Sequence, residues 1–135
     1  MALEIQSRER EGIAILELHG RLAVGGASLL REKVNEAMAA GHANVILDLK
    51  DVDHIDSTGL GTMVICYTSL QRAGGSLKLA RLNRRNVELL LLTKLSTVFE
   101  IFADEQDAVN SFFPEREIKH FDILSFVKQQ QEEEA

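Results

Sequence analysis

The stretch Asp48-Leu-Lys-Asp-Val-Asp-His-Ile-Asp-Ser-Thr-Gly-Leu-Gly61 determines most of what this chain can be. It leaves an apolar strand at residues 45–49, passes through an acidic loop and enters a helix that begins near Ser57. Ser57 and Thr58 therefore stand where unpaired backbone N–H groups gather and the helix dipole is positive. A hydroxyl in that position can cap a helix or carry a phosphate.

Outward from this stretch, strand and helix patterns alternate along the chain. Period-2 patterns, capping residues and glycine breaks predict nine elements in the order β-β-α-β-α-β-α-β-α. A mixed α/β (α+β) fold follows, with a four- to five-stranded sheet and helices packed mainly on one face. The predicted strands cover residues 3–8, 13–19, 45–49, 77–80 and 98–102, and the helices begin near Ala27, Ser57, Asn83 and Asp104.

Composition changes after Pro114, the only proline. We predict one domain over residues 1–114 and a C-terminal extension over 115–135 that is helical. The extension either docks on its own domain or forms a contact with a second copy or a partner through Phe121, Leu124 and Phe126.

Charge and cysteine content narrow the function classes. The net charge is −6 and the isoelectric point is near 5.2, which disfavours nucleic acid and an anionic membrane surface as partners. The single cysteine, Cys66, excludes an internal disulfide and suits a reducing compartment. There is no signal-peptide pattern and no apolar run long enough to span a bilayer. The sequence therefore predicts a cytoplasmic protein without membrane insertion.

The residue types do not favour catalysis. Ser57, His54 and Asp56 are too close in sequence for a triad, and no nucleophile-elbow motif surrounds the serine. The four histidines lack metal-ligand spacing. Gly59 and Gly61 lack the lysine of a nucleotide-binding loop and are expected to permit close helix–sheet packing. We predict no enzyme activity, no metal and no cofactor.

The remaining function that this segment can support is regulation of partner binding by phosphorylation. A phosphoryl group on Ser57 would add roughly 1.5 to 2 negative charges, and the helix N-terminus could accommodate them. Asp53 and Asp56 would add repulsion toward an acidic partner surface. Ile65, placed with Thr62 on the helix face away from the core, could supply an apolar partner contact, although burial of Ile65 under a neighbouring helix is an equal alternative.

Five segments together resemble a STAS domain, and more narrowly a bacterial anti-sigma factor antagonist. The resemblance covers about residues 3–113. It is carried by Gly20-Arg-Leu22, Val45-Ile-Leu-Asp-Leu49, Ile55-Asp-Ser-Thr-Gly-Leu60, Gly75-x-Leu-Lys-Leu79 and Leu95-Ser-Thr-Val-Phe-Glu-Ile-Phe102.

The resemblance implies partner switching. An anti-sigma factor with serine kinase activity would phosphorylate Ser57, or less readily Thr58, and a PP2C-type phosphatase would reverse this. The unphosphorylated chain would bind the anti-sigma factor, and the phosphorylated chain would release it. ATP would belong to the kinase. The implied partner-binding residues are Asp53, Asp56, Ser57, Thr58, Gly59, Leu60, Thr62 and Ile65.

Two features depart from the usual pattern of this family. Many members are acidic after the segment matching Gly20-Arg-Leu22, where this chain has Ala23 followed by Val24. That loop is expected near the helix that carries Ser57. The added extension leaves open a second reading, a non-catalytic scaffold or adaptor in a stressosome-type, two-component or transporter-associated complex.

Overall fold

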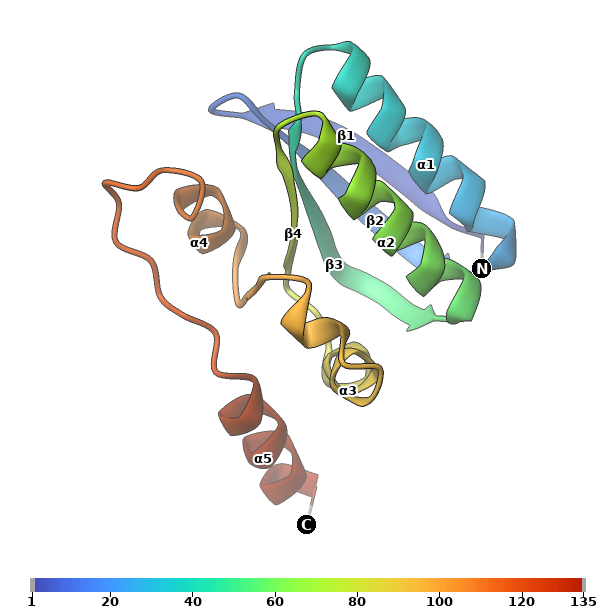
Figure 1. Cartoon of the computed structure of the whole chain (residues 1–135). Helices are drawn as coiled ribbons and strands as arrows, with labels where there is room; N and C mark the ends of the chain where they lie inside the picture. Colours follow the sequence, from blue (N-terminus) through green and yellow to red (C-terminus); the bar gives the residue numbers. More distant parts are fainter. Residues whose placement is uncertain (1, 135) are drawn as a thin grey trace.

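A single mixed sheet organises the protein (Figure 1). Its five strands lie in chain order: β1 (Glu4–Arg10), β2 (Ile13–Leu22), β3 (Asn44–Ile55), β4 (Ser76–Ala80) and β5 (Ile101–Phe102). β1 is antiparallel to β2, and all later pairs are parallel. The structure is a computed structural model that describes residues 2–134, of which residues 130–134 are described by their backbone alone.

The helices pack mainly on one face of this sheet, as predicted. α1 and α2 lie side by side across it, whereas α4 lies apart from them (Figure 1). The bounds are α1 (Val24–Ala39), α2 (Ser57–Arg72), α3 (Arg84–Leu92), the 3₁₀ turn η1 (Leu95–Thr97), α4 (Glu105–Asn110) and α5 (Ile123–Glu134). β5 is shorter than the predicted strand over residues 98–102, and η1 precedes it in the connection from α3.

Alternation along β2 creates two hydrophobic clusters. Leu16 and Leu18 point into the main core beneath α1 and α2. Ile13 and Ile15 point to the other face, where they pack with Ala108 of α4 in a second cluster. The sheet is therefore covered on both sides at this end, which explains the nearly continuous apolar sequence of β2.

The predicted acidic loop is wrong, because β3 continues as a strand as far as Ile55. β2 is also longer than predicted and reaches Leu22, so it offers pairing partners to this part of β3. Gly20 pairs with Val52 and Leu22 with Ile55, across two shifts in register. These irregularities disturb the period-2 pattern from which a strand end is predicted.

α1 begins at Val24 and not at Ala27. Gly26 is therefore helical rather than part of a break, and its missing side chain has a packing role. A Cβ atom added there would lie 2.7 Å from the Cβ of Leu3. The Gly25-Gly26 pair marks a close contact between the helix and the N-terminal segment.

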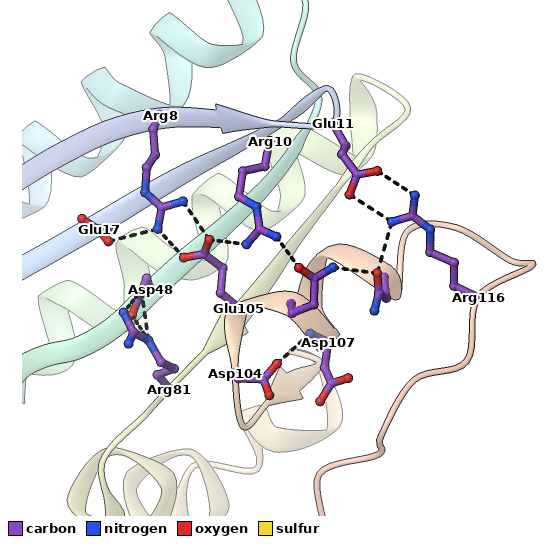
Figure 2. A network of polar contacts seen from close by, with 12 residues as sticks. Arg8, Arg10, Glu11, Glu17, Asp48, Arg81, Asp104, Glu105, Asp107 and Arg116 are labelled. Atoms are coloured by element: carbon purple, nitrogen blue, oxygen red, sulfur yellow. Dashed lines mark hydrogen bonds and ion pairs between the residues drawn. The ribbon is translucent and has the colours of Figure 1, made fainter.

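An ion-pair network fastens α4 to the sheet (Figure 2). Arg8 and Arg10 of β1 both donate hydrogen bonds to Glu105, at 2.7 and 2.6 Å. Arg8 also bridges to Glu17 at 3.0 Å. The bonds from Arg8, followed by those from Arg10, lower the pKa of Glu105 to about 2.

A neighbouring pair completes the network. The Nε of Arg81 lies 3.1 Å from both carboxylate oxygens of the buried Asp48. Carboxylate oxygens of Glu17, Asp48 and Glu105 lie within 4.8 Å of one another. Each of these carboxylates is thus paired with a guanidinium, which balances its charge within the protein.

The extension returns to its own domain. α5 packs on α3, and four apolar side chains at or near its start join the main core cluster: Phe121, Ile123, Phe126 and Val127. Docking on the same domain is therefore the arrangement seen, with Leu124 left 74% exposed. The division into residues 1–114 and 115–135 stays a prediction, and Ala135 lies outside the described residues. No helix among the described residues is long and apolar enough to cross a membrane.

We expect Glu105→Gln to destabilise the protein at neutral pH by about 1–3 kcal/mol, because two guanidinium groups lose their charged partner. The pKa of Glu105 is lower in the folded state than its ordinary 4.5. Its contribution is therefore present above that value and is lost as pH falls toward 2.

Thermal or urea unfolding of wild type and variant from pH 7 to pH 2.5 measures this contribution. The stability difference should shrink below about pH 4.5. Glu36→Gln, in an exposed pair with Lys33, is the control and should change stability little. A difference for Glu105→Gln that is constant over the whole pH range would contradict the ion-pair account.

Candidate functional site: the start of α2

Asp56 caps α2. Its backbone is extended, and its Oδ1 accepts a 2.8 Å hydrogen bond from the N–H of Gly59. Its own N–H donates to the carbonyl of Leu22 at 3.2 Å, and its carbonyl accepts from the N–H of Leu60 at 2.9 Å. The cap is therefore Asp56 itself, so the Ser57 hydroxyl is not the group that fulfils this role.

Gly59 sets how closely α2 approaches the sheet. A Cβ atom at this position would lie 2.2 Å from the carbonyl oxygen of Leu22, so only glycine fits. At Gly61 an added Cβ would have nothing within 4 Å. The predicted packing role is thus confirmed for Gly59 and wrong for Gly61.

This approach turns Ser57 and Thr58 outward. Both residues are exposed in the first turn of α2, and Asp53 is exposed at the end of β3. Two hydroxyls and a carboxylate therefore lie at one end of the sheet, beside the positive end of a 16-residue helix. The predicted phosphorylation site is accessible.

The other predicted partner-binding residues of α2 differ in their exposure to solvent. Ile65 is 46% exposed, so the alternative of burial under a neighbouring helix is excluded. Gly59 and Leu60 are buried, and Thr62 is also buried, with 6% of its surface exposed. Its placement on the outer face is wrong: Thr62 lies between Gly59 and Cys66, three and four residues away, on the face that Gly59 brings against the sheet.

Sequence reasoning missed an apolar residue beside the site. Val24, the first residue of α1, is 72% exposed. With Arg21, Ala23 and Asp56 it lines a hollow between the starts of α1 and α2. The expectation that the loop at Ala23 lies near the switch helix is confirmed. The sequence signal that could have identified Val24 is its position as an apolar residue directly before Gly25-Gly26.

Comparison with known proteins decides the family. The sequence pattern of the STAS domain matches residues 4–108. The anti-sigma-B factor antagonist of Bacillus subtilis (strain 168) is 33% identical over 109 residues, which are 81% of this chain and 99% of that protein. The chain belongs to the STAS domain family.

Two solved structures resemble this STAS domain. A candidate anti-sigma factor antagonist from Thermotoga maritima has a TM-score of 0.75 at 27% identity, over 79% of this chain and 92% of that one. The Bacillus cell fate determinant SpoIIAA in its phosphorylated form has a TM-score of 0.64 at 18% identity, over 81% and 99% of the two chains. At that identity, the likeness to SpoIIAA concerns the fold alone.

The polar residues beside Ser57 in this STAS domain have other contacts. The Asp56 carboxylate, which a triad would need, is engaged by the N–H of Gly59. His54 lies within β3, opposite Arg21 of β2. Burial raises the pKa of the Cys66 thiol to about 11, so that this group is protonated at neutral pH.

We predict opposite effects for alanine at the two glycines of α2. Gly59→Ala should destabilise the domain by about 1–3 kcal/mol, because either α2 or the end of β2 must shift. Gly61→Ala, the matched control, should be neutral or stabilising by up to about 1 kcal/mol, since alanine favours a helix and meets no neighbour. Urea unfolding of both variants checks this, and equal effects would disprove the close-approach role of Gly59.

Proposed function

We propose that this STAS protein is an anti-sigma factor antagonist whose partner binding is switched by phosphorylation of Ser57. The supporting observation is the exposed Ser57 hydroxyl at the start of a helix that Asp56 already caps. Because the cap does not use this hydroxyl, a phosphate can be added without removing a bond on which the helix depends.

The partner is an anti-sigma factor with serine kinase activity. Relatives from several bacteria are named anti-sigma factor antagonists, which supports an anti-sigma factor as the partner. The match covers 99% of the B. subtilis relative. Kinase activity is proposed because Ser57, with Thr58 as the lesser candidate, is reachable from solvent. A PP2C-type phosphatase would restore the hydroxyl.

The docking surface consists of Asp53, Ser57, Thr58 and Ile65 from the switch segment, together with Val24 of α1. Exposed apolar side chains at Val24 and Ile65 offer area that a partner can bury. Asp53 favours a basic partner surface. The buried Gly59, Leu60 and Thr62 act by shaping the start of α2 and not by touching the partner.

A phosphate would disrupt this surface by charge and hydration. It adds roughly 1.5 to 2 negative charges next to two aspartates, and the desolvation of such a group is costly at an interface. A 100-fold loss of affinity corresponds to only about 2.8 kcal/mol. The fold itself is compatible with a phosphorylated state, since SpoIIAA, which shares it, exists in that form.

We expect Ser57→Ala to bind the anti-sigma factor constitutively, whereas Ser57→Asp should bind at least about 10-fold more weakly, a difference near 1.4 kcal/mol. The partner is first obtained by co-purification with the Ser57→Ala variant from the source cells. Calorimetric titration then gives the affinities, before and after incubation of wild type with ATP and Mg²⁺.

Ser125→Asp, an exposed site on α5, controls for a remote negative charge, and Thr58→Ala tests the lesser phosphorylation site. Equal affinities of Ser57→Ala and Ser57→Asp would refute the switch. That result would favour the second candidate, a STAS scaffold or adaptor, for which the extension beyond the matched residues 4–108 is the supporting observation.

A further inference from the structure

β1 is an open edge of the sheet. It stands at the end of the strand order and, among the described strands, pairs with β2 alone (Figure 1). All seven of its residues keep one regular register with β2, without the shifts that interrupt the pairing of β2 with β3. Residues 6–9 are exposed. The opposite edge of the sheet differs, because β5 has only two residues.

The turn between β1 and β2 decides which backbone groups face outward. Glu11 and Gly12 form a two-residue turn, and both have a positive φ, 52° and 83°. The residues that flank such a turn, Arg10 and Ile13, form a hydrogen-bonded pair, and these pairs alternate along an antiparallel ladder. β1 therefore directs the N–H and C=O groups of every second residue away from β2, and these residues are Ile5, Ser7 and Glu9.

The features that usually protect such an edge are missing from β1. Exposed strands are commonly kept apart by unpaired charges, prolines or bulges. β1 contains no proline and no bulge, and its two arginines, Arg8 and Arg10, are both paired with Glu105 of α4. These bonds draw both guanidinium groups toward α4, on one face of the sheet, and not across its edge.

The sequence of β1 is complementary to itself in the antiparallel direction. A two-fold axis through Ser7 would set Glu4 opposite Arg10 of a second copy at both ends of a new ladder. Like charges directly opposite each other destabilise a ladder, and this register contains none. Its remaining pairs would be Ser7 with Ser7, Gln6 with Arg8, and Ile5 with Glu9.

We propose that two copies of the chain associate through β1 and form one continuous antiparallel sheet across a two-fold axis at Ser7. The outward N–H and C=O groups of β1 supply the hydrogen bonds, and its charge pattern sets the register. Lys33 and Glu36 of α1 line a hollow together with Ser7 and Glu9, so α1 adds surface beside the strand. Because one strand pair buries little area, the dimer is weak and depends on concentration.

The dimer leaves the switch segment free. Ser57 follows β3, and β2 separates β3 from β1. Each dimer therefore presents two copies of the surface around Ser57. Since the new ladder does not use Ser57, phosphorylation there should not change the dimer, and the inference does not rest on the proposed function.

Disulfide trapping tests the axis, because the single native cysteine, Cys66, is buried. In Ser7→Cys the two introduced thiols would face each other, with Cα atoms about 5.5 Å apart, within the range of a disulfide. Glu9→Cys is the matched control, since its thiols would lie four residues apart along the ladder, roughly 14 Å. We expect mild oxidation to crosslink Ser7→Cys at least 10-fold faster than Glu9→Cys.

Sedimentation equilibrium of the wild type is the second measurement. Its mass should rise from 15.0 kDa toward twice that value as the concentration increases. Ser7→Pro loses an N–H that faces away from β2, so it should stay monomeric; if this variant does not unfold cooperatively, the two cysteine variants decide.

Three results would overturn the proposal. The first is a wild type that keeps the mass of one chain at every concentration. The second is equal crosslinking of Ser7→Cys and Glu9→Cys. The third is a folded Ser7→Pro variant that doubles its mass as wild type does, which would assign the dimer to another surface.

Discussion

The carbonyl of Leu22 is the point on which the site depends. It accepts the N–H of Asp56 at 3.2 Å, and it lies where a side chain on Gly59 would collide with it. A bare Cα at Gly59 lets α2 start directly against the end of β2, and the Asp56 cap orients its first turn. Because the helix is held by its backbone and its inner face, Ser57 and Thr58 are free to point outward. The orientation of Ser57 and Thr58 thus follows from one missing Cβ atom and one capping carboxylate.

The two faces of the sheet are stabilised by different forces. Beneath α1 and α2 the contacts are almost entirely apolar, as expected for parallel strands covered by crossover helices. On the other face, α4 has only six residues: Ala108 and Val109 are buried in the second cluster, and the arginines of β1 add ion pairs to Glu105. The extension links these layers, since Ile118 packs on the second cluster and Phe121 on the main one. The extension therefore contacts both hydrophobic clusters, which lie on opposite faces of the sheet.

Local sequence signals predict the order of the elements and the start of α2. They also predict that α3 begins at Asn83, and the Oδ1 of Asn83 accepts a 2.8 Å hydrogen bond from the N–H of Asn86. The end of β3 was missed because register shifts and alternate polar residues imitate a loop. Thr62 is buried, although the prediction places it with Ile65, because the close approach at Gly59 decides which face of α2 lies against the sheet. The contact between Arg8 and Glu105 joins residues 97 positions apart, and no local pattern reports such a pair.

Phosphopeptide mass spectrometry on the protein from its own cells measures directly whether Ser57 carries a phosphate. Trypsin releases residues 51–72 as one fragment, which contains Ser57, Thr58 and all other hydroxyls of α2. We predict phosphate on Ser57, with an occupancy that changes with growth condition. Phosphate confined to Thr58, or none on this fragment under any condition in which the protein is expressed, would contradict it.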